Sequence, residues 1–211
     1  MTGIIYFLAN LSIVSSLFPL FFLIFGKKIR STFFLKLFVL ELVIVNLLNL
    51  VLFYFTDIDQ INLFSIHNLI ENCLIFLIFN NLKNLGFFNE KLCFSIIIFN
   101  IGLFLFLLNY NANDRFNYFS TFSIVFMSLF SVLIIIDRFR NSQYVNLFDD
   151  FSFNLSTSIL LYNGLQLYVI FFNSLILQNA DKLFLYTWPI VQISSILYYL
   201  LISRAIWKLK N

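Results

Sequence analysis

Charged residues are scarce in this chain. Only 11% of its 211 residues are Asp, Glu, Lys or Arg, while 61% are hydrophobic. Average soluble domains carry about 25% charged residues, so the composition excludes an ordinary soluble protein. Together with a mean hydropathy of +0.94, it is typical of an integral membrane protein. Residue types that carry chemistry or shape tight turns are also few: one His, two Cys, five Gly and two Pro.

These scarcities exclude several kinds of site. The chain has a single histidine, His67, so it cannot form a metal site that needs several histidine ligands. Cys73 and Cys93 stand in no spacing typical of a zinc site or an extracellular disulfide, so we interpret both as small packing residues. The sequence has no phosphate-cradling glycine loop and no nucleophile-elbow serine. We therefore expect no enzyme activity, no metal and no cofactor. No folded basic patch is predicted that would dock nucleic acid.

Long apolar stretches fill almost the whole chain. About 20 helical residues are needed to cross roughly 30 Å of hydrocarbon. Seven stretches reach this length, near residues 4–25, 33–55, 61–81, 92–110, 117–136, 152–177 and 184–207. The gaps between them are too short to hold a soluble domain. We expect an all-α polytopic membrane protein, with residues 1–211 forming a single seven-helix transmembrane domain in the lipid bilayer.

Basic residues gather in every second gap between these stretches. Of the thirteen Lys and Arg residues, only Arg115 and Lys182 lie in the other gaps, which leaves eleven on one side. Those eleven are Lys27, Lys28, Arg30, Lys36, Lys83, Lys91, Arg138, Arg140, Arg204, Lys208 and Lys210. The positive-inside rule assigns their side to the cytoplasm. This predicts an N-terminus outside and a cytoplasmic C-terminus.

Ionisable and amide residues stand inside the second and third stretches. They are Glu41, His67, Asn68, Glu71 and Asn72. An ionisable residue at mid-membrane costs about 2.5–3.5 kcal/mol on insertion scales, so such residues normally face the bundle interior or a water cavity. At 1.5 Å per residue, Glu41 and Glu71 both lie about 12–14 Å from the cytoplasmic boundary and would meet at one level. We interpret the group as a proton-binding or cation-binding site, as the floor of a ligand pocket, or as a hydrogen-bond cluster that fixes helix packing.

Polar stripes also run along the sixth and seventh stretches. Asn163 and Gln166 belong to the first stripe. Trp188, Gln192, Ser195 and Tyr199 form the second, at helical spacings of four, three and four. We predict that the two stripes face a pocket lined by helices two, three, six and seven. The alternative is polar contact between the helices alone.

Three segments resemble a group of small uncharacterised seven-helix proteins of Bacteroidetes-type bacteria. They are the run Ile66-His67-Asn68-Leu69-Ile70-Glu71, the segment 154–164 with Tyr162, and the ending Arg204-Ala205-Ile206-Trp207-Lys208. The resemblance implies a multi-pass protein of the bacterial inner membrane, and by analogy a receptor-like role. Members carry a His-x-x-x-Glu pattern that His67 and Glu71 match. Many carry a His-Asn pair early in helix seven, where this chain has Pro189-Ile190.

Three functions follow as hypotheses. The leading one is a ligand-sensing or signal-coupling module that binds a small or lipophilic ligand and contacts a cytoplasmic or membrane protein partner. The second is a small proton-coupled transporter, although the sequence has no paired halves with broken helices of the kind found in inverted-repeat transporters. The third is an accessory structural subunit of a larger membrane complex.

Overall fold

The computed structural model describes residues 2–25, 33–55, 61–82, 88–141, 146–176 and 180–209, with side chains over 7–25, 33–52, 63–81, 88–112, 114–140, 146–169 and 189–209. The described residues form seven α-helices. In chain order these are α1 (Thr2–Phe25), α2 (Phe33–Phe55), α3 (Ile61–Leu82), α4 (Glu90–Leu107), α5 (Ala112–Asn141), α6 (Phe151–Ile176) and α7 (Ala180–Lys208). A short 3-10 helix, η1 (Leu147–Asp149), precedes α6. All seven helices expected from the apolar stretches are present.

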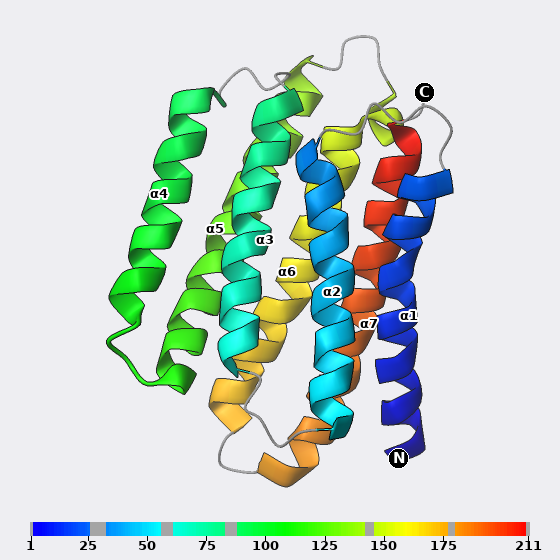
Figure 1. Ribbon diagram of the computed structural model, residues 1–211, viewed down its shortest axis with the longest axis vertical. Helices are drawn as coiled ribbons and strands as arrows, with labels where there is room; N and C mark the ends of the chain where they lie inside the picture. The colour runs from blue at the N-terminus through cyan, green and yellow to red at the C-terminus, as the bar shows by residue number, and fades with distance from the viewer. Residues whose placement is uncertain are drawn as a thin grey trace.

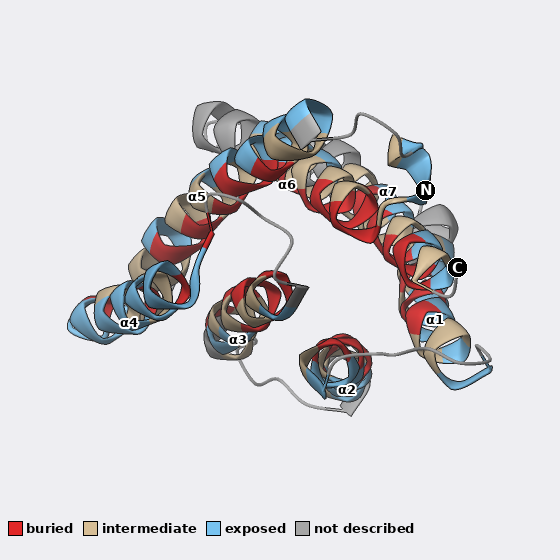
Figure 2. Ribbon diagram, turned by 90° about the horizontal axis from the view of Figure 1, so that it is seen from above, coloured by how far each residue is buried: buried red, intermediate tan, exposed pale blue. Residues whose placement is uncertain are grey.

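Six helices enclose a central space, and the seventh lies outside it. Figure 2 shows α4, α5, α6, α7 and α1 following one another along an arc, with α2 and α3 on its concave side. The arc is held by extensive packing of α6 against both α5 and α7, and of α7 against α1. Contacts of α2 with α1, of α2 with α3, and of α3 with α5 complete the ring. Helix α4 packs on the outside, against α3 and α5.

The chain is a multi-pass helical membrane protein. Within the described residues, six helices are long and apolar enough to cross a membrane: α1, α2, α3, α4, α5 and α7. Helix α6 carries polar residues such as Asn154, Ser156 and Asn163, and all three are buried. A helix placed between two others tolerates this polarity because its polar groups face protein rather than lipid.

Basic residues collect at one end of the bundle, which we call the basic end. Lys36 lies at the start of α2 and Lys91 at the start of α4, while Arg138 and Lys208 lie at the ends of α5 and α7. Because the helices alternate in direction, all these positions fall at the end that holds the C-terminus (Figure 1). Arg115, near the start of α5, lies at the opposite end, with the N-terminus.

The apolar core occupies the half of the bundle nearer the basic end. Its largest fully buried side chains include Phe38 of α2, Phe76 and Phe79 of α3, and Ile202 and Ile206 of α7. Phe76 and Phe130 form an edge-to-face pair with ring centroids 4.8 Å apart. The prediction that Cys93 is a packing residue is confirmed, since it is fully buried in this core. Bulky aromatic and aliphatic side chains therefore fill one half of the bundle.

Neither of the two glycines with described surroundings lies at a close helix crossing. A Cβ atom built on Gly102 or Gly164 would meet nothing within 4 Å. Neither glycine therefore marks a close approach of two backbones.

Charged side chains join helices at the basic end through ion pairs and one contact between a cation and an aromatic ring. Lys208, the last residue of α7, pairs with Asp149 of η1. The Arg138 side chain of α5 lies 3.8 Å from the Asp150 carboxylate, measured from Nε to Oδ1. Arg204 of α7 lies over the ring of Phe148, 5.9 Å from its centroid. Residues 148–150, which precede α6, therefore contact both α5 and α7 at the basic end.

Candidate functional site

A cavity of about 580 Å³ lies between the six helices of the ring. Its lining comes from α1, α2, α3, α5, α6 and α7. Most lining residues fall on the side of the apolar core that is away from the basic end, and the two regions share Ile75, Met127, Ile159, Tyr198 and Tyr199. One half of the bundle is therefore packed and the other half is hollow.

Three ionisable side chains meet at the boundary between these halves. His67 Nδ1 of α3 is paired with the Glu41 carboxylate of α2. His67 Nε2 lies 3.7 Å from Glu71 Oε2, one turn along α3. The prediction that Glu41 and Glu71 meet at one level is confirmed, because both approach the same imidazole ring. Glu71 lines the cavity, whereas Glu41 stands behind His67 and does not.

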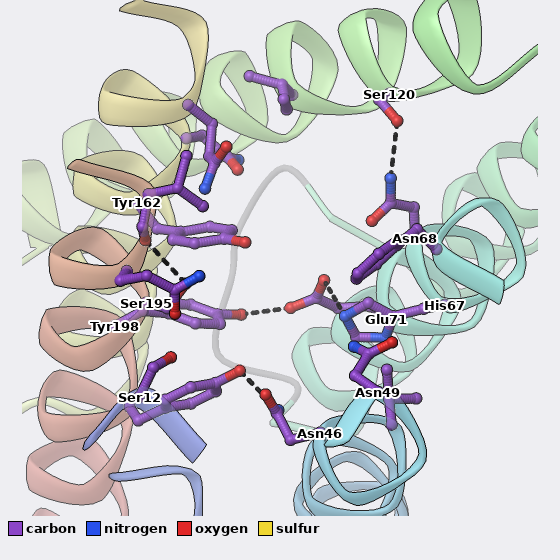
Figure 3. Close-up of a pocket in the computed structure, with 18 of the residues that line it drawn as sticks. Ser12, Asn46, Asn49, His67, Asn68, Glu71, Ser120, Tyr162, Ser195 and Tyr198 are labelled. Carbon is purple, nitrogen blue, oxygen red and sulfur yellow. Dashed lines mark hydrogen bonds and ion pairs between the residues drawn. The ribbon is translucent and has the colours of Figure 1, made fainter. Parts of the chain in front are cut away.

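Tyrosines of α6 and α7 face this cluster across the cavity. The Tyr198 hydroxyl donates a hydrogen bond of 2.6 Å to Glu71 Oε1. The Tyr162 ring stacks on the Tyr198 ring with centroids 4.5 Å apart. Figure 3 shows both rings extending from their helices with the hydroxyls directed toward Glu71. Asn46 of α2 donates a hydrogen bond of 2.7 Å to the Tyr199 hydroxyl. These contacts join α7 to α2 and α3 at the end of the cavity nearer the basic end, which we call the cavity floor.

Other polar residues continue the lining away from the floor. Asn68 of α3 donates a hydrogen bond of 2.9 Å to Ser120 of α5. Three lining residues each have one buried polar atom without a hydrogen-bond partner among the described residues: Asn49 Oδ1, Asn72 Nδ2 and Ser123 Oγ. A buried polar atom left without a partner costs roughly 1–3 kcal/mol. Such an atom gains a partner only if a bound molecule or water reaches it.

Most residues predicted for the site line the cavity. They are His67, Asn68, Glu71, Asn72, Asn163, Gln166, Gln192, Ser195 and Tyr199. Glu41 belongs to the cluster but not to the lining. The side chain of Trp188 lies outside the described residues.

The predicted set of lining helices was too small. Besides α2, α3, α6 and α7, the cavity is lined by α1, through residues such as Ser12, and by α5, through residues such as Ser123. Sequence reasoning missed these because serine is tolerated in any transmembrane helix and gives a weak signal. It also missed Asn46 and Asn49, although two amides three residues apart in an apolar helix were a usable signal. Tyr198 was passed over in favour of its neighbour Tyr199.

The cluster is not arranged as a metal site. Within the part of the chain that the structure describes, no group of three or more His, Cys, Asp or Glu residues has the arrangement to hold a metal ion. What the cavity offers instead is hydrogen bonding from amides and hydroxyls, together with one carboxylate next to an imidazole. This is the chemistry of a site that binds a polar molecule or a proton.

Comparison with known proteins gives no relative from which to transfer a role. No protein-family model, no curated protein and no solved structure matches the chain. The resemblance to small seven-helix proteins of Bacteroidetes-type bacteria therefore stays a prediction.

Proposed function

We propose that this protein is a seven-helix ligand-sensing or signal-coupling module of a bacterial inner membrane, with its N-terminus outside. The observation that carries the proposal is the cavity of about 580 Å³, lined by amide, hydroxyl and carboxyl side chains among apolar ones. Ligand sites in proteins are typically concave, about 300–1,000 Å³ in volume, and lined by a few directed polar groups. The bacterial inner membrane comes from the family resemblance alone.

The orientation rests on the charge distribution. The described basic residues concentrate at the end that holds the C-terminus, and the positive-inside rule puts that end in the cytoplasm. All seven helices then cross the membrane, with α6 protected from lipid by its neighbours. The cavity lies in the outer half, so its ligand would arrive from outside or from the outer leaflet. The basic end would be the surface for a partner protein.

Long-range contacts from the cavity floor make sensing feasible. Tyr198 and Glu71 join α7 to α3, and Tyr199 and Asn46 join α7 to α2. A ligand bound at the floor would compete with or extend these hydrogen bonds. It shifts the protein between two states only if its affinity for the two states differs. The interhelical hydrogen bonds at the floor are the contacts through which such a difference would arise.

The test is ligand-dependent thermal stability of the purified protein with a cavity-filling variant. Ser123→Leu places a larger side chain in the cavity wall, and Ser95→Leu makes the same change on an exposed position of α4. A compound present at 100 times its Kd stabilises the folded protein by about 2.7 kcal/mol. We expect wild type and Ser95→Leu to be stabilised by at least one compound of a chemically mixed library, and Ser123→Leu to respond much less. A library without any stabilising compound, or an equal response of both variants, would contradict the proposal.

A proton-coupled carrier is the second candidate, because the Glu41, His67 and Glu71 cluster joins two carboxyls through one imidazole. A carrier must also open toward the basic end, where Phe38, Phe76 and Ile202 are now fully buried. Flux into proteoliposomes with and without a pH gradient tests this function. A carrier would give gradient-dependent flux that Glu71→Gln abolishes and Glu90→Gln, on the exposed start of α4, leaves intact. Absence of flux under every gradient would exclude it.

A further inference from the structure

We infer that the cavity takes an organic cation, specifically a protonated primary amine, with the ammonium group against Glu71. This rests on the proposed function, since it names the ligand class of the same cavity. Three observations carry it: the charge of the lining, the oxygen atoms that surround Glu71, and the size of the space.

The polar cluster at the cavity holds two acidic side chains and one basic side chain. Among the described lining residues, the only ionisable side chains of acid or base type besides the tyrosines are His67 and Glu71. Glu41 stands behind His67, so the cluster holds two carboxyls and one imidazole. No Lys or Arg is among the lining residues that the structure describes. One positive charge on the ligand balances the cluster, while an anion would meet like charge and the carboxylate of a zwitterion would find no Lys or Arg in the described lining.

Oxygen acceptors cluster where the ammonium would sit. Glu71 Oε1 already accepts from Tyr198, but Oε2 lies 3.7 Å from His67 Nε2, beyond hydrogen-bond distance. The Tyr162 hydroxyl is directed at Glu71 from the facing wall (Figure 3). The lining residue Asn49 adds a buried amide oxygen, Oδ1, without a hydrogen-bond partner among the described residues. An ammonium group brings three N–H donors, which suits several oxygen acceptors, whereas a quaternary ammonium brings none.

The volume argues for an organic ligand over an inorganic ion. At about 580 Å³ the cavity holds a molecule of many non-hydrogen atoms, and a lone ion would leave most of it to water. Apolar side chains such as Ile124, Met127 and Val169 contribute to the same wall. An amine with an apolar or aromatic body uses both kinds of surface, so we expect the ammonium at the floor and the body toward the opposite end.

Three probes with the same phenyl group and similar size test the charge requirement. We would measure binding of 2-phenylethylamine, 2-phenylethanol and phenylacetate to the full-length protein in detergent at neutral pH, by thermal shift and by calorimetry. The amine should bind about tenfold or more tightly than the alcohol, since a hydrogen bond to a charged group is roughly that much stronger, and phenylacetate should bind weakest. Glu71→Gln should remove most of the preference for the amine. Glu90→Gln removes the same charge from an exposed position of α4 and should leave the preference intact.

A milder variant guards against loss of folding in Glu71→Gln. Tyr162→Phe removes one hydroxyl and keeps the ring stacked on Tyr198, so it should weaken amine binding several-fold and alcohol binding much less. Equal or tighter binding of the alcohol or of phenylacetate, with loss of that binding in Ser123→Leu, would overturn the amine assignment and leave the proposed function standing. Stabilisation by sodium or potassium chloride alone would overturn it in favour of an inorganic cation. If neither these probes nor any compound of the mixed library binds, the proposed function fails together with the ligand class.

Discussion

Replacing His67 by Leu gives the sharpest test of how the polar cluster is held together. His67 is a polar partner of Glu41, whose second oxygen, Oε2, is buried and has no hydrogen-bond partner among the described residues. The Glu41 and His67 side chains are only 11% and 14% exposed, so water cannot replace the lost partner freely. Glu71 would lose less, because it keeps the hydrogen bond from Tyr198. The variant thus isolates Glu41 as a buried carboxyl without a partner.

The expected size of the effect follows from the kind of contact that is lost. Removing one member of a buried ion pair typically costs about 3–5 kcal/mol, because the other charge stays behind uncompensated. Neutral hydrogen bonds between membrane helices average only about 0.6 kcal/mol. We therefore expect His67→Leu to lower the free energy of unfolding by more than about 2 kcal/mol. The double variant His67→Leu with Glu41→Leu removes the stranded carboxyl and should regain most of this loss.

Equilibrium unfolding in mixed detergent micelles measures all members of the cycle: wild type, both single variants and the double variant. The decisive quantity is the difference in free energy of unfolding between the double variant and His67→Leu, and the double variant should be the more stable. Residues in contact show interaction energies of about 0.5–3 kcal/mol, whereas independent sites add. If the losses of the two single variants simply add in the double variant, Glu41 does not depend on His67 and the reasoning is refuted.

Three further predictions concern the packed half of the bundle. Phe76→Ala should lower the free energy of unfolding by about 3 kcal/mol, because Phe76 is fully buried. Phe94→Ala, on the exposed face of α4, should change it little, and denaturant titrations of both variants measure the difference. Cys93 is fully buried and should not react with a thiol reagent until the protein unfolds, so native labelling of Cys93 would contradict its position. Lys208→Ala should lower the free energy of unfolding by less than about 1 kcal/mol, because the side chain of its partner Asp149 is 48% exposed. Unfolding measured over a range of salt concentrations checks this.

Fold prediction succeeded because the membrane imposes one strong rule on sequence. Every backbone polar group in hydrocarbon must be satisfied within the segment, so a long apolar stretch is almost always a helix. The stretch predicted at 33–55 matches α2 (Phe33–Phe55). The stretch at 117–136 falls short of α5 (Ala112–Asn141) at both ends, because polar residues there extend the helix beyond its apolar part. Hydropathy detects the part of a helix that lies in lipid, not the whole helix.

The sequence indicated the clustering of residues that the bilayer makes costly and missed lining residues that it tolerates. Glu41, His67 and Glu71 stood out because an ionisable side chain in an apolar stretch needs a partner, and helix direction put the two carboxyls at one depth. Ser12 and Ser123 gave no such signal. Which helices border one another is decided by packing between side chains, and this pattern is not readable from one helix at a time. Hence the parts played by α1 and α5 appear only in the folded bundle.

The division into a packed and a hollow half gives α7 a particular place in the sensing proposal. Tyr198 and Tyr199 lie at the cavity floor, Ile202 and Ile206 lie in the apolar core, and Lys208 is paired at the basic end. Ten residues of helix separate Tyr198 from Lys208, a rise of about 15 Å. A continuous helix with no proline between these points shifts or rotates as one body more readily than it bends. A change of hydrogen bonding at Tyr198 would therefore reach the ion pair between Lys208 and Asp149 through the helix itself, provided that the core allows α7 a second position.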